Sequence, residues 1–152
     1  MYLSIKGMST KVRRGSHTTS WLTVHLIFVT KYRYKVLKGE IQNRFRDLIR
    51  QDCNALEIRI LKGVVSSDHV HIHIEYPPKL SVSGISKQLK GRSSTKLQKE
   101  YPQLRKRYWG NRFWGRGFGA FSTGNITEEM VNEYIEGHRK NPNDKADNFF
   151  LD

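Results

Sequence analysis

The stretch GVVSSDHVHIHIEY, residues 63–76, carries the strongest structural signal in this chain. Three histidines alternate in it with Val and Ile, and alternation with a period of two is typical of a β-strand. Side chains at positions i, i+2 and i+4 of a strand point to one face of the sheet. We therefore expect His69, His71 and His73 to project together, with Glu75 next in the same row.

A row of imidazoles on a rigid strand predicts a site for a divalent metal ion, because neutral ring nitrogens are good metal ligands. Neighbouring members of the row lie ~6.5–7 Å apart, so three of them cannot easily reach one ion. Two adjacent histidines with a third ligand from elsewhere in the chain fit better. Because protonation removes the lone pair, we expect binding to weaken below about pH 6.

Part of the same stretch also matches the first part of the metal-binding motif of cupins, with Gly63, then His69 and His71, then Glu75. The glycine that would close the motif is replaced by Val82, and no second motif follows. The helices expected from the pattern do not suit a small all-β barrel, and a cupin does not account for the charge of the chain. The cupin is thus the weaker interpretation.

On the N-terminal side of this stretch the hydrophobic pattern changes between strand and helix. Residues 21–30 are rich in β-branched and aromatic side chains and predict a central strand. Residues 57–65 predict another strand, with a bulge at Gly63. The segment 40–54 between them carries apolar residues at helical spacing, including the single Cys53, which we place in the core.

On the C-terminal side, helices are expected after Ser81 and after Thr127, because each residue is a good N-cap followed by apolar residues at helical spacing. Between them, Phe113 and Trp114 alternate as in an edge strand, and residues 118–123 predict a short last strand. The complete order is strand, helix, strand, strand, helix, strand, strand, helix. It fits an α+β ferredoxin-like antiparallel sheet of about five strands, with helices on one face and an additional C-terminal helix.

Two further positions in these elements are candidates for the site. In the last helix, Tyr134 and His138 are four residues apart and therefore side by side, next to a core stripe of Val131 and Ile135. In the first strand, His25 either supports a metal ligand or is a buried histidine with satisfied hydrogen bonds.

The composition indicates a polyanionic partner. The chain has 27 Lys and Arg against 14 acidic residues, a net charge of +13 and a pI of about 10.0. This excess of positive charge favours nucleic acid over an anionic membrane as the partner. The alternative is that the charges only keep the surface highly solvated. Residues 87–116 hold ten Lys and Arg and one acid, Glu100, interleaved with aromatic residues. Rings that stack on splayed bases beside cations that face the backbone are typical of proteins that bind single-stranded nucleic acid.

The length of 152 residues suits one domain, and no internal repeat or linker is evident. We expect a basic N-terminal arm over residues 1–16 that contacts phosphates or simply frays, a single domain over 17–140, and a polar tail over 141–152. One cysteine excludes a disulfide within the chain, and no segment has the pattern of a signal peptide or a membrane span. These features are typical of a cytoplasmic protein without membrane contact.

Several motifs, taken in order, resemble the transposases of the insertion-sequence-200/605 type, which are HUH single-tyrosine enzymes. Their signature is a His, a bulky apolar residue and a His, matched here by His69-Val70-His71 after Asp68, together with one nucleophilic tyrosine. The triplet alone is weakly specific, but the ordered set of matches is strongly specific. The further matching segments are Val29–Arg33, Pro77–Ser83, Leu89–Ser94, Arg107–Gly110, Phe113–Gly117 and Glu133–His138.

The resemblance implies that His69 and His71 bind a divalent metal, Mg²⁺ or Mn²⁺, and that Tyr134 is the nucleophile. Members of the family usually have a Gln four residues after the tyrosine as the third ligand, and this chain has His138 there. They usually have an aliphatic residue where this chain has His73, which is then a bystander or a substitute ligand.

The resemblance also implies a prokaryotic, DNA-associated homodimer, in which the tyrosine helix of one subunit completes the histidine site of the other or acts within its own subunit. The substrate of the family is single-stranded DNA with hairpins at the element ends, cut and rejoined through a 5′-phosphotyrosine intermediate. We expect the basic arm to contact this DNA, together with six cations: Lys31, Arg33, Lys90, Arg92, Arg112 and Arg116.

Two other functions stay open. One is a non-catalytic ferredoxin-like module that binds nucleic acid through aromatic residues of its sheet. The other is an HUH nuclease that serves replication or conjugation. A pure binding module needs neither the histidine row nor Tyr134 beside His138, and the small size and single tyrosine favour a transposase over the other nucleases.

Overall fold

The computed structural model describes residues 12–108, 112–122 and 124–138. The tail expected over 141–152 and residues 1–11 of the expected arm lie outside the described residues. Among the described residues, no helix has the length and apolar character needed to cross a membrane. The elements in chain order are β1 (Arg13–Arg14), β2 (Thr19–Ser20), β3 (Leu22–Val29), η1 (Lys31–Arg33), α1 (Gly39–Ala55), β4 (Arg59–Val65), β5 (His69–Tyr76), α2 (Val82–Glu100), α3 (Pro102–Arg107), β6 (Gly119–Phe121) and α4 (Glu128–Glu136).

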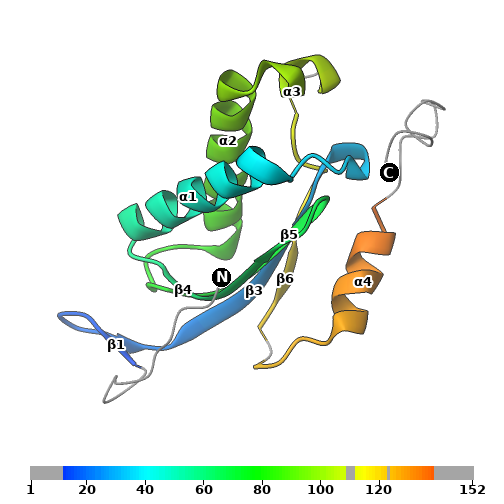
Figure 1. The fold of residues 1–152 in the computed structure, drawn as a ribbon. Helices are drawn as coiled ribbons and strands as arrows, with labels where there is room; N and C mark the ends of the chain where they lie inside the picture. The colour runs from blue at the N-terminus through cyan, green and yellow to red at the C-terminus, as the bar shows by residue number, and fades with distance from the viewer. Residues whose placement is uncertain (1–11, 109–111, 123, 139–152) are drawn as a thin grey trace.

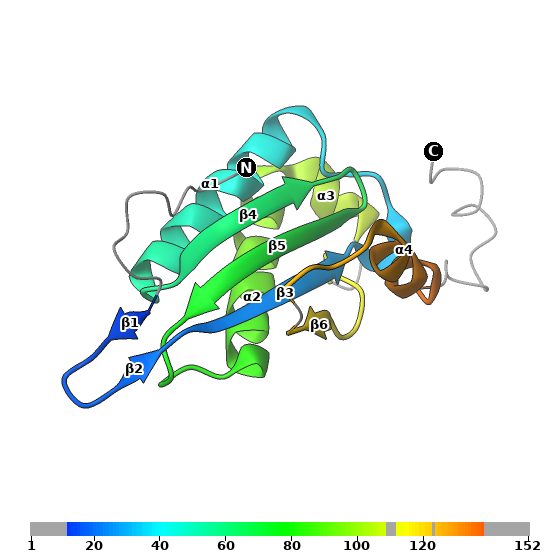
Figure 2. The same ribbon diagram turned by 90° about the horizontal axis from the view of Figure 1, so that it is seen from below.

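The main sheet has four antiparallel strands in the order β4-β5-β3-β6, which Figure 2 shows side by side. The histidine strand β5 pairs with β3 along its whole length and with β4 on its other edge. The register with β4 shifts between Ile60 and Lys62, so the predicted bulge is present but does not lie at Gly63. The α+β antiparallel architecture is confirmed, and the histidine row lies on an interior strand.

Over the described residues the main sheet has four strands, where about five were predicted. The strand expected around Phe113 is reduced to a single bridge between Trp114 and Thr30. The reason is that Phe113 is fully buried and the indole N–H of Trp114 donates to Oγ of Ser93 at 2.9 Å, so these side chains enter the helical layer. The last strand is limited to the three residues of β6, and a short helix that was not predicted, α3, begins at Pro102.

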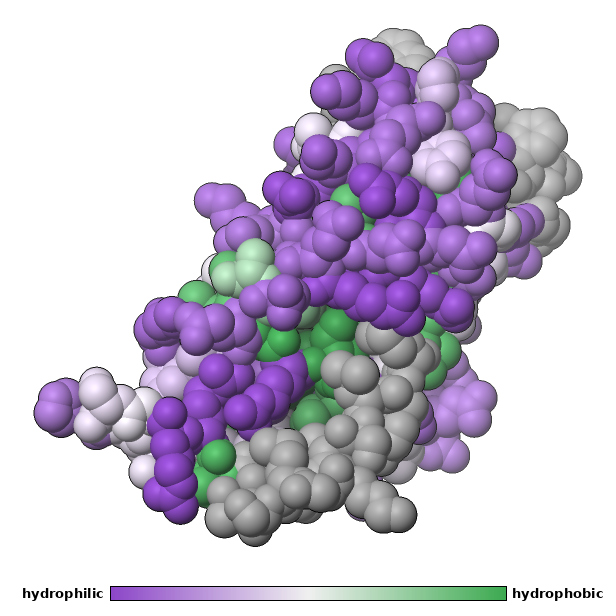
Figure 3. All heavy atoms as spheres, turned by 60° about the vertical axis from the view of Figure 1, so that its left-hand side comes forward, coloured by the Kyte–Doolittle hydropathy of each residue, from purple (hydrophilic) through white to green (hydrophobic). Residues whose placement is uncertain are grey.

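The two long helices and α4 cover opposite faces of the sheet. Figure 1 shows α1 and α2 on one side of the strands and α4 on the other. The larger core lies beneath α1 and α2 and includes Leu26, Phe28 and Ile72 of the strands. Cys53 belongs to this core, as predicted, and burial raises the pKa of its thiol to about 12. The side of the molecule that Figure 3 brings forward is mostly hydrophilic, as expected for a helical layer that carries many Lys and Arg outward.

The described part of the N-terminal arm, residues 12–16, contains β1, which pairs with β2 just beyond the arm to form a hairpin. Arg13 donates to both carboxylate oxygens of Glu75, at 2.8 Å from Nε and 2.7 Å from Nη2. The side chain of Glu75 is 0% exposed, and a buried carboxylate requires a cation beside it. Arg13 therefore anchors the hairpin to the end of the histidine row.

Candidate active site

The three histidines of β5 lie on the face of the sheet that α4 covers. They line a groove of about 870 Å³ with residues of β3, of β4 and of the segment that leads into α4. The polar part of its wall includes Lys62, Asn125 and Asn132. The predicted projection of the row to one face is confirmed by the alternation of half-exposed histidines with buried Val and Ile along β5.

His25 of β3 is packed against this row. Its Nδ1 lies 3.1 Å from Nε2 of His71, and its ring stacks on that of His73 with centroids 3.8 Å apart. Burial, with a smaller contribution from the charge of His25, lowers the pKa of His71 and of His73 to about 4. At neutral pH both imidazoles are therefore uncharged, which is the state that binds a metal ion. His25 is itself buried, as expected, and it also touches an expected ligand.

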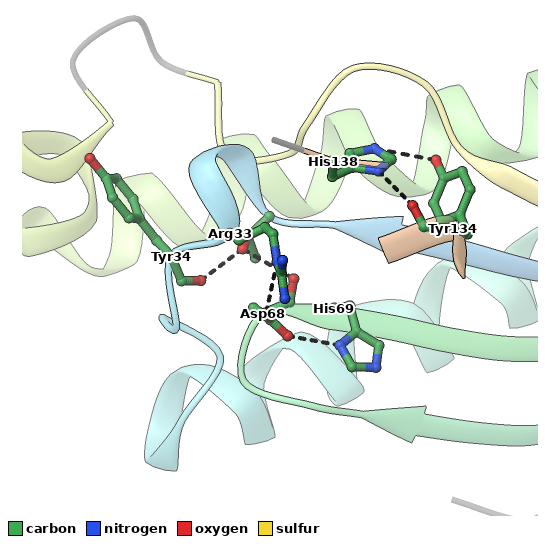
Figure 4. A network of polar contacts seen from close by, with 7 residues as sticks. Arg33, Tyr34, Asp68, His69, Tyr134 and His138 are labelled. Carbon is green, nitrogen blue, oxygen red and sulfur yellow. Dashed lines mark hydrogen bonds and ion pairs between the residues drawn. The ribbon is translucent and has the colours of Figure 1, made fainter. Parts of the chain in front are cut away.

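His69 is held by the residue that precedes it. Its Nδ1 lies 2.8 Å from Oδ1 of Asp68, and Nε of Arg33 lies 3.5 Å from the other carboxylate oxygen. Figure 4 shows the three side chains in this order. The hydrogen bond from His69 is the main reason that the pKa of Asp68 lies below its usual value; burial opposes this shift, and the charges of His69 and Arg33 add to it.

Tyr134 and His138 lie side by side at the end of α4, as predicted. Oη of Tyr134 is 3.4 Å from Nε2 of His138, and Nδ1 of His138 is 3.2 Å from the main-chain oxygen of Tyr134 (Figure 4). The tyrosine ring rests on Gly119 of β6, where an added Cβ would come within 3.3 Å of ring carbons. Burial raises the pKa of Tyr134 to about 12, so the phenol is protonated at neutral pH in this position.

The tyrosine pair and the histidine row lie on opposite sides of β3. Gly119, beneath Tyr134, pairs with Ile27 of β3, and Ile27 pairs with His71 of β5. We call the histidine row of β5 the histidine half of the site, and Tyr134 with His138 the tyrosine half. Since neighbouring strands are about 4.8 Å apart, the two halves are separated by roughly two strand spacings. In keeping with this, the described part of the chain contains no group of three or more His, Cys, Asp or Glu that could hold a metal ion. The chain therefore does not bring His138 to the histidine row within one subunit.

Two of the six cations expected at DNA support the protein itself. Lys90 is half-buried, and its ammonium donates to the main-chain oxygens of Gly115 and Gly117 at 2.9 and 2.6 Å. Burial lowers the pKa of Lys90. Arg92 forms an ion pair with the buried Asp52. Both cations hold α2 to its surroundings, and their contact with DNA stays a prediction.

The other four cations comprise two half-buried residues, Lys31 and Arg33, and two exposed ones. Lys31 lies over the ring of Tyr32, 5.3 Å from its centroid, and Arg33 faces the carboxylate beside the histidine row. Arg112 and Arg116 are exposed. Their surroundings leave the last two available to a polyanion, and DNA contact stays a prediction for all four.

Two residues that shape the site, Asp68 and Gly119, have no role predicted from the sequence. Asp68 enters the prediction only as the residue before the His69-Val70-His71 triplet, although an Asp directly before a candidate ligand is a signal that could have been used. Gly119 falls within the strand predicted over residues 118–123, but its contact with Tyr134 depends on the tertiary fold and has no local signal.

Known proteins share both the sequence pattern and this fold. The family described as "Transposase IS200 like" matches residues 18–138. The transposase for insertion sequence element IS200 of Salmonella typhimurium (strain LT2) is 33% identical over 121 residues, which are 80% of this chain and 79% of that protein. The ISDra2 transposase TnpA of Deinococcus radiodurans is 29% identical over 126 residues, 83% of this chain and 90% of the relative.

A solved structure agrees with these relatives. The crystal structure of a protein described as a transposase from Deinococcus radiodurans R1 has a TM-score of 0.78 and 26% identity, and the match covers 85% of this chain and 99% of the other. With the family match over residues 18–138, this likeness shows that the fold is shared. The chain belongs to the family of IS200-like transposases, enzymes that process DNA.

Proposed function

We propose that this transposase cuts and rejoins single-stranded DNA at hairpin-bearing element ends through a 5′-phosphotyrosine intermediate. The proposal rests on one observation: a row of three histidines, of which His71 and His73 are neutral, and a tyrosine that faces a further histidine share one face of one sheet. A non-catalytic module would need neither group. The match to the two transposases over most of their length supports a catalytic role.

Tyr134 is the nucleophile in this proposal. Its Oη loses a proton and attacks the scissile phosphorus, the bond from phosphorus to the 3′ oxygen breaks, and that oxygen takes up a proton and leaves as a hydroxyl. A second 3′-hydroxyl then attacks the phosphotyrosine, and the phenol of Tyr134 is restored. Because the covalent bond retains the energy of the phosphodiester, rejoining needs no nucleotide cofactor.

His69 and His71 are the proposed ligands of a divalent cation, Mg²⁺ or Mn²⁺, with His138 as the third. The donor set of the strand fits this role, because His71 is kept neutral by burial and the bond to Asp68 leaves Nε2 of His69 with its lone pair. When bound, the cation would polarise the scissile phosphate. His73 stays a bystander or a substitute ligand.

We assign Tyr134 and the third ligand to the partner subunit of a homodimer. The supporting observation is the separation of His138 from the histidine row of its own chain by the width of β3. The position on Gly119 also raises the pKa of Tyr134, which is unfavourable for a nucleophile. Transfer of the tyrosine from this apolar position to a cationic site would favour the phenolate.

The test is formation of a covalent adduct. The protein is incubated with hairpin-bearing single-stranded DNA and Mg²⁺ or Mn²⁺, and a slower band that carries both protein and DNA is expected on a denaturing gel. Tyr134→Phe should abolish the adduct, and His69→Ala should reduce it by about 10²-fold or more, as is typical when a catalytic metal loses a ligand.

Matched controls are available in the same chain. Tyr101→Phe removes a tyrosine hydroxyl whose contact is a long 3.4 Å bond to the main-chain oxygen of Glu40, and His17→Ala removes an exposed histidine of the hairpin. Both should form the adduct at the wild-type rate. An adduct that persists in Tyr134→Phe would show that another residue is the nucleophile.

A further inference from the structure

Asp68 determines which nitrogen of His69 can bind a ligand. Oδ1 of Asp68 lies 2.8 Å from Nδ1 of His69, and the side chain of Asp68 is only 13% exposed. A carboxylate accepts hydrogen bonds and cannot donate one, so Nδ1 must carry the proton. The lone pair of His69 is then on Nε2, the nitrogen that points away from Asp68. Nε2 of His71, by contrast, faces Nδ1 of His25 at 3.1 Å.

Arg33 holds Asp68 from the other side. Its Nε lies 3.5 Å from Oδ2 of Asp68, so each oxygen of the carboxylate has its own partner. Arg33 reaches this place through an unusual backbone, since Tyr32 and Arg33 both have positive φ angles, 62° and 56°. Residues with a side chain rarely adopt this conformation, and it persists only where the surroundings require it.

The surroundings are main-chain bonds between two loops. Thr30 donates from its main-chain N to the main-chain oxygen of Asp68 at 2.9 Å, and its Oγ1 lies 2.7 Å from the oxygen of Tyr34. Leu37 donates to the oxygen of Ser67 at 2.9 Å. These bonds tie the loop that carries Arg33 to the turn that carries Asp68. Figure 4 shows Arg33 and Asp68 next to His69.

We propose that Asp68, held by Arg33, is a positioning residue that fixes His69 as the Nδ1–H tautomer and presents its Nε2 to the catalytic cation. The identity of the cation in this inference rests on the proposed function, whereas the tautomer of His69 does not. It also gives Arg33 a role in the site that differs from the predicted DNA contact. Partners of this kind around metal-binding histidines typically contribute about 10- to 100-fold in metal affinity.

The tautomer can be read without metal, DNA or activity. Long-range ¹H–¹⁵N correlation spectra of the full-length protein, labelled at histidine nitrogens and at mildly alkaline pH, distinguish a protonated from an unprotonated ring nitrogen. We expect wild-type His69 to be protonated at Nδ1 alone. Asp68→Ala should shift His69 towards the Nε2–H form, and Asp68→Asn, which keeps an acceptor at the same place, should largely restore the wild-type form.

Metal affinity gives the second readout. Electron paramagnetic resonance of free Mn²⁺ should show about 10- to 100-fold weaker binding by Asp68→Ala than by wild type, with a smaller loss for Arg33→Ala. Asp47→Ala is the matched control, because Asp47 is an exposed Asp on α1 (57% side-chain exposure), and it should bind Mn²⁺ like wild type. Since the bonds from Thr30 reach the main chain of Asp68, each variant keeps them.

Three outcomes would test the positioning role of Asp68 and the proposed metal chemistry separately. Wild-type His69 protonated at Nε2, or unchanged Mn²⁺ affinity in Asp68→Ala, would overturn the positioning role. Should the wild type bind no Mn²⁺ at all, the proposed metal chemistry fails. The tautomer of His69 in wild type and in Asp68→Ala would then still decide whether Asp68 positions the ring.

Discussion

The two halves of the candidate site are held very differently. The histidine half stands on β5, an interior strand that is hydrogen-bonded to β3 and to β4 along its length, above a large core. The tyrosine half stands on α4, a helix of nine residues that packs on the sheet through a small cluster. Val131 and Ile135 of α4 meet Ile27 and Val29 of β3 there.

This difference suggests separate mechanical roles. Regions with few buried apolar contacts open at a lower free energy than the core strands of the same protein. A metal site requires ligands at fixed distances, which β5 and the Asp68 turn provide. A nucleophile that serves the partner subunit, as we propose, must leave its own sheet, which the small cluster beneath α4 permits.

The strongest test that the two halves of the site come from different subunits is complementation between two inactive variants. Tyr134→Phe and His69→Ala should each be inactive alone, whereas mixed dimers contain one site with wild-type histidines and a wild-type tyrosine. Random mixing in equal amounts makes half of the dimers mixed, each with one working site of two, so about a quarter of wild-type adduct formation should return. The adduct gel measures this recovery.

The control is a mixture of Tyr134→Phe with the double variant that carries both substitutions. No dimer in that mixture has a complete site, so it should stay inactive. If the first mixture is also inactive although mixed dimers are present, the tyrosine acts within its own subunit.

The histidine half illustrates what sequence patterns can predict. Alternation over residues 69–76 predicted the common face of His69, His71 and His73, because side-chain direction in a strand depends only on position. Helical spacing likewise predicted the contact of Tyr134 with His138, which the 3.4 Å distance confirms.

Long-range contacts could not be predicted in the same way. The bond of Arg13 to Glu75 joins residues far apart in the chain, and the position of Tyr134 on Gly119 depends on how β6 pairs with β3. The prediction of an edge strand around Trp114 was wrong, because the indole N–H of Trp114 donates a hydrogen bond to Ser93 of α2. Local periodicity does not contain the information that decides between an edge strand and such a contact.

Acid should lower the free energy of unfolding through the imidazoles of the histidine half. His71 and His73 have pKa values of about 4 in the fold, below the ordinary value of about 6.5, so the unfolded chain binds protons more readily between these values. The stability from the neutral imidazoles is complete above about pH 6.5 and is lost as the pH falls towards about 4. Between pH 7 and pH 5 we expect a loss on the order of 1 to 2 kcal/mol, after allowance for the solvent that screens these half-buried rings.

Denaturant unfolding at the two pH values measures this loss. His73→Leu removes one of the two groups and should show a shallower dependence on pH, whereas His17→Ala, on the exposed hairpin, should keep the wild-type slope. An unfolding free energy that does not change between the two pH values would mean that the pKa values of these imidazoles are not lowered in the fold.

The smallest effect concerns the contact beneath the tyrosine. Hydrogen exchange should be faster in α4 than in β5 of the wild type, and Gly119→Ala should increase that difference. Its Cβ would lie 3.3 Å from the ring of Tyr134, so α4 must shift by a few tenths of an ångström. A mild overpacking of about 1 kcal/mol corresponds to roughly fivefold faster opening of α4, with β5 unchanged.

Gly124→Ala is the matched substitution for this contact, because a Cβ added at Gly124 meets nothing within 4 Å. It should leave exchange in α4 within about twofold of wild type. Equal acceleration in α4 and β5 by Gly119→Ala would show that the two halves open together. In that case α4 is part of the main cooperative unit, and the tyrosine could not leave its sheet without unfolding the strand that carries the histidines.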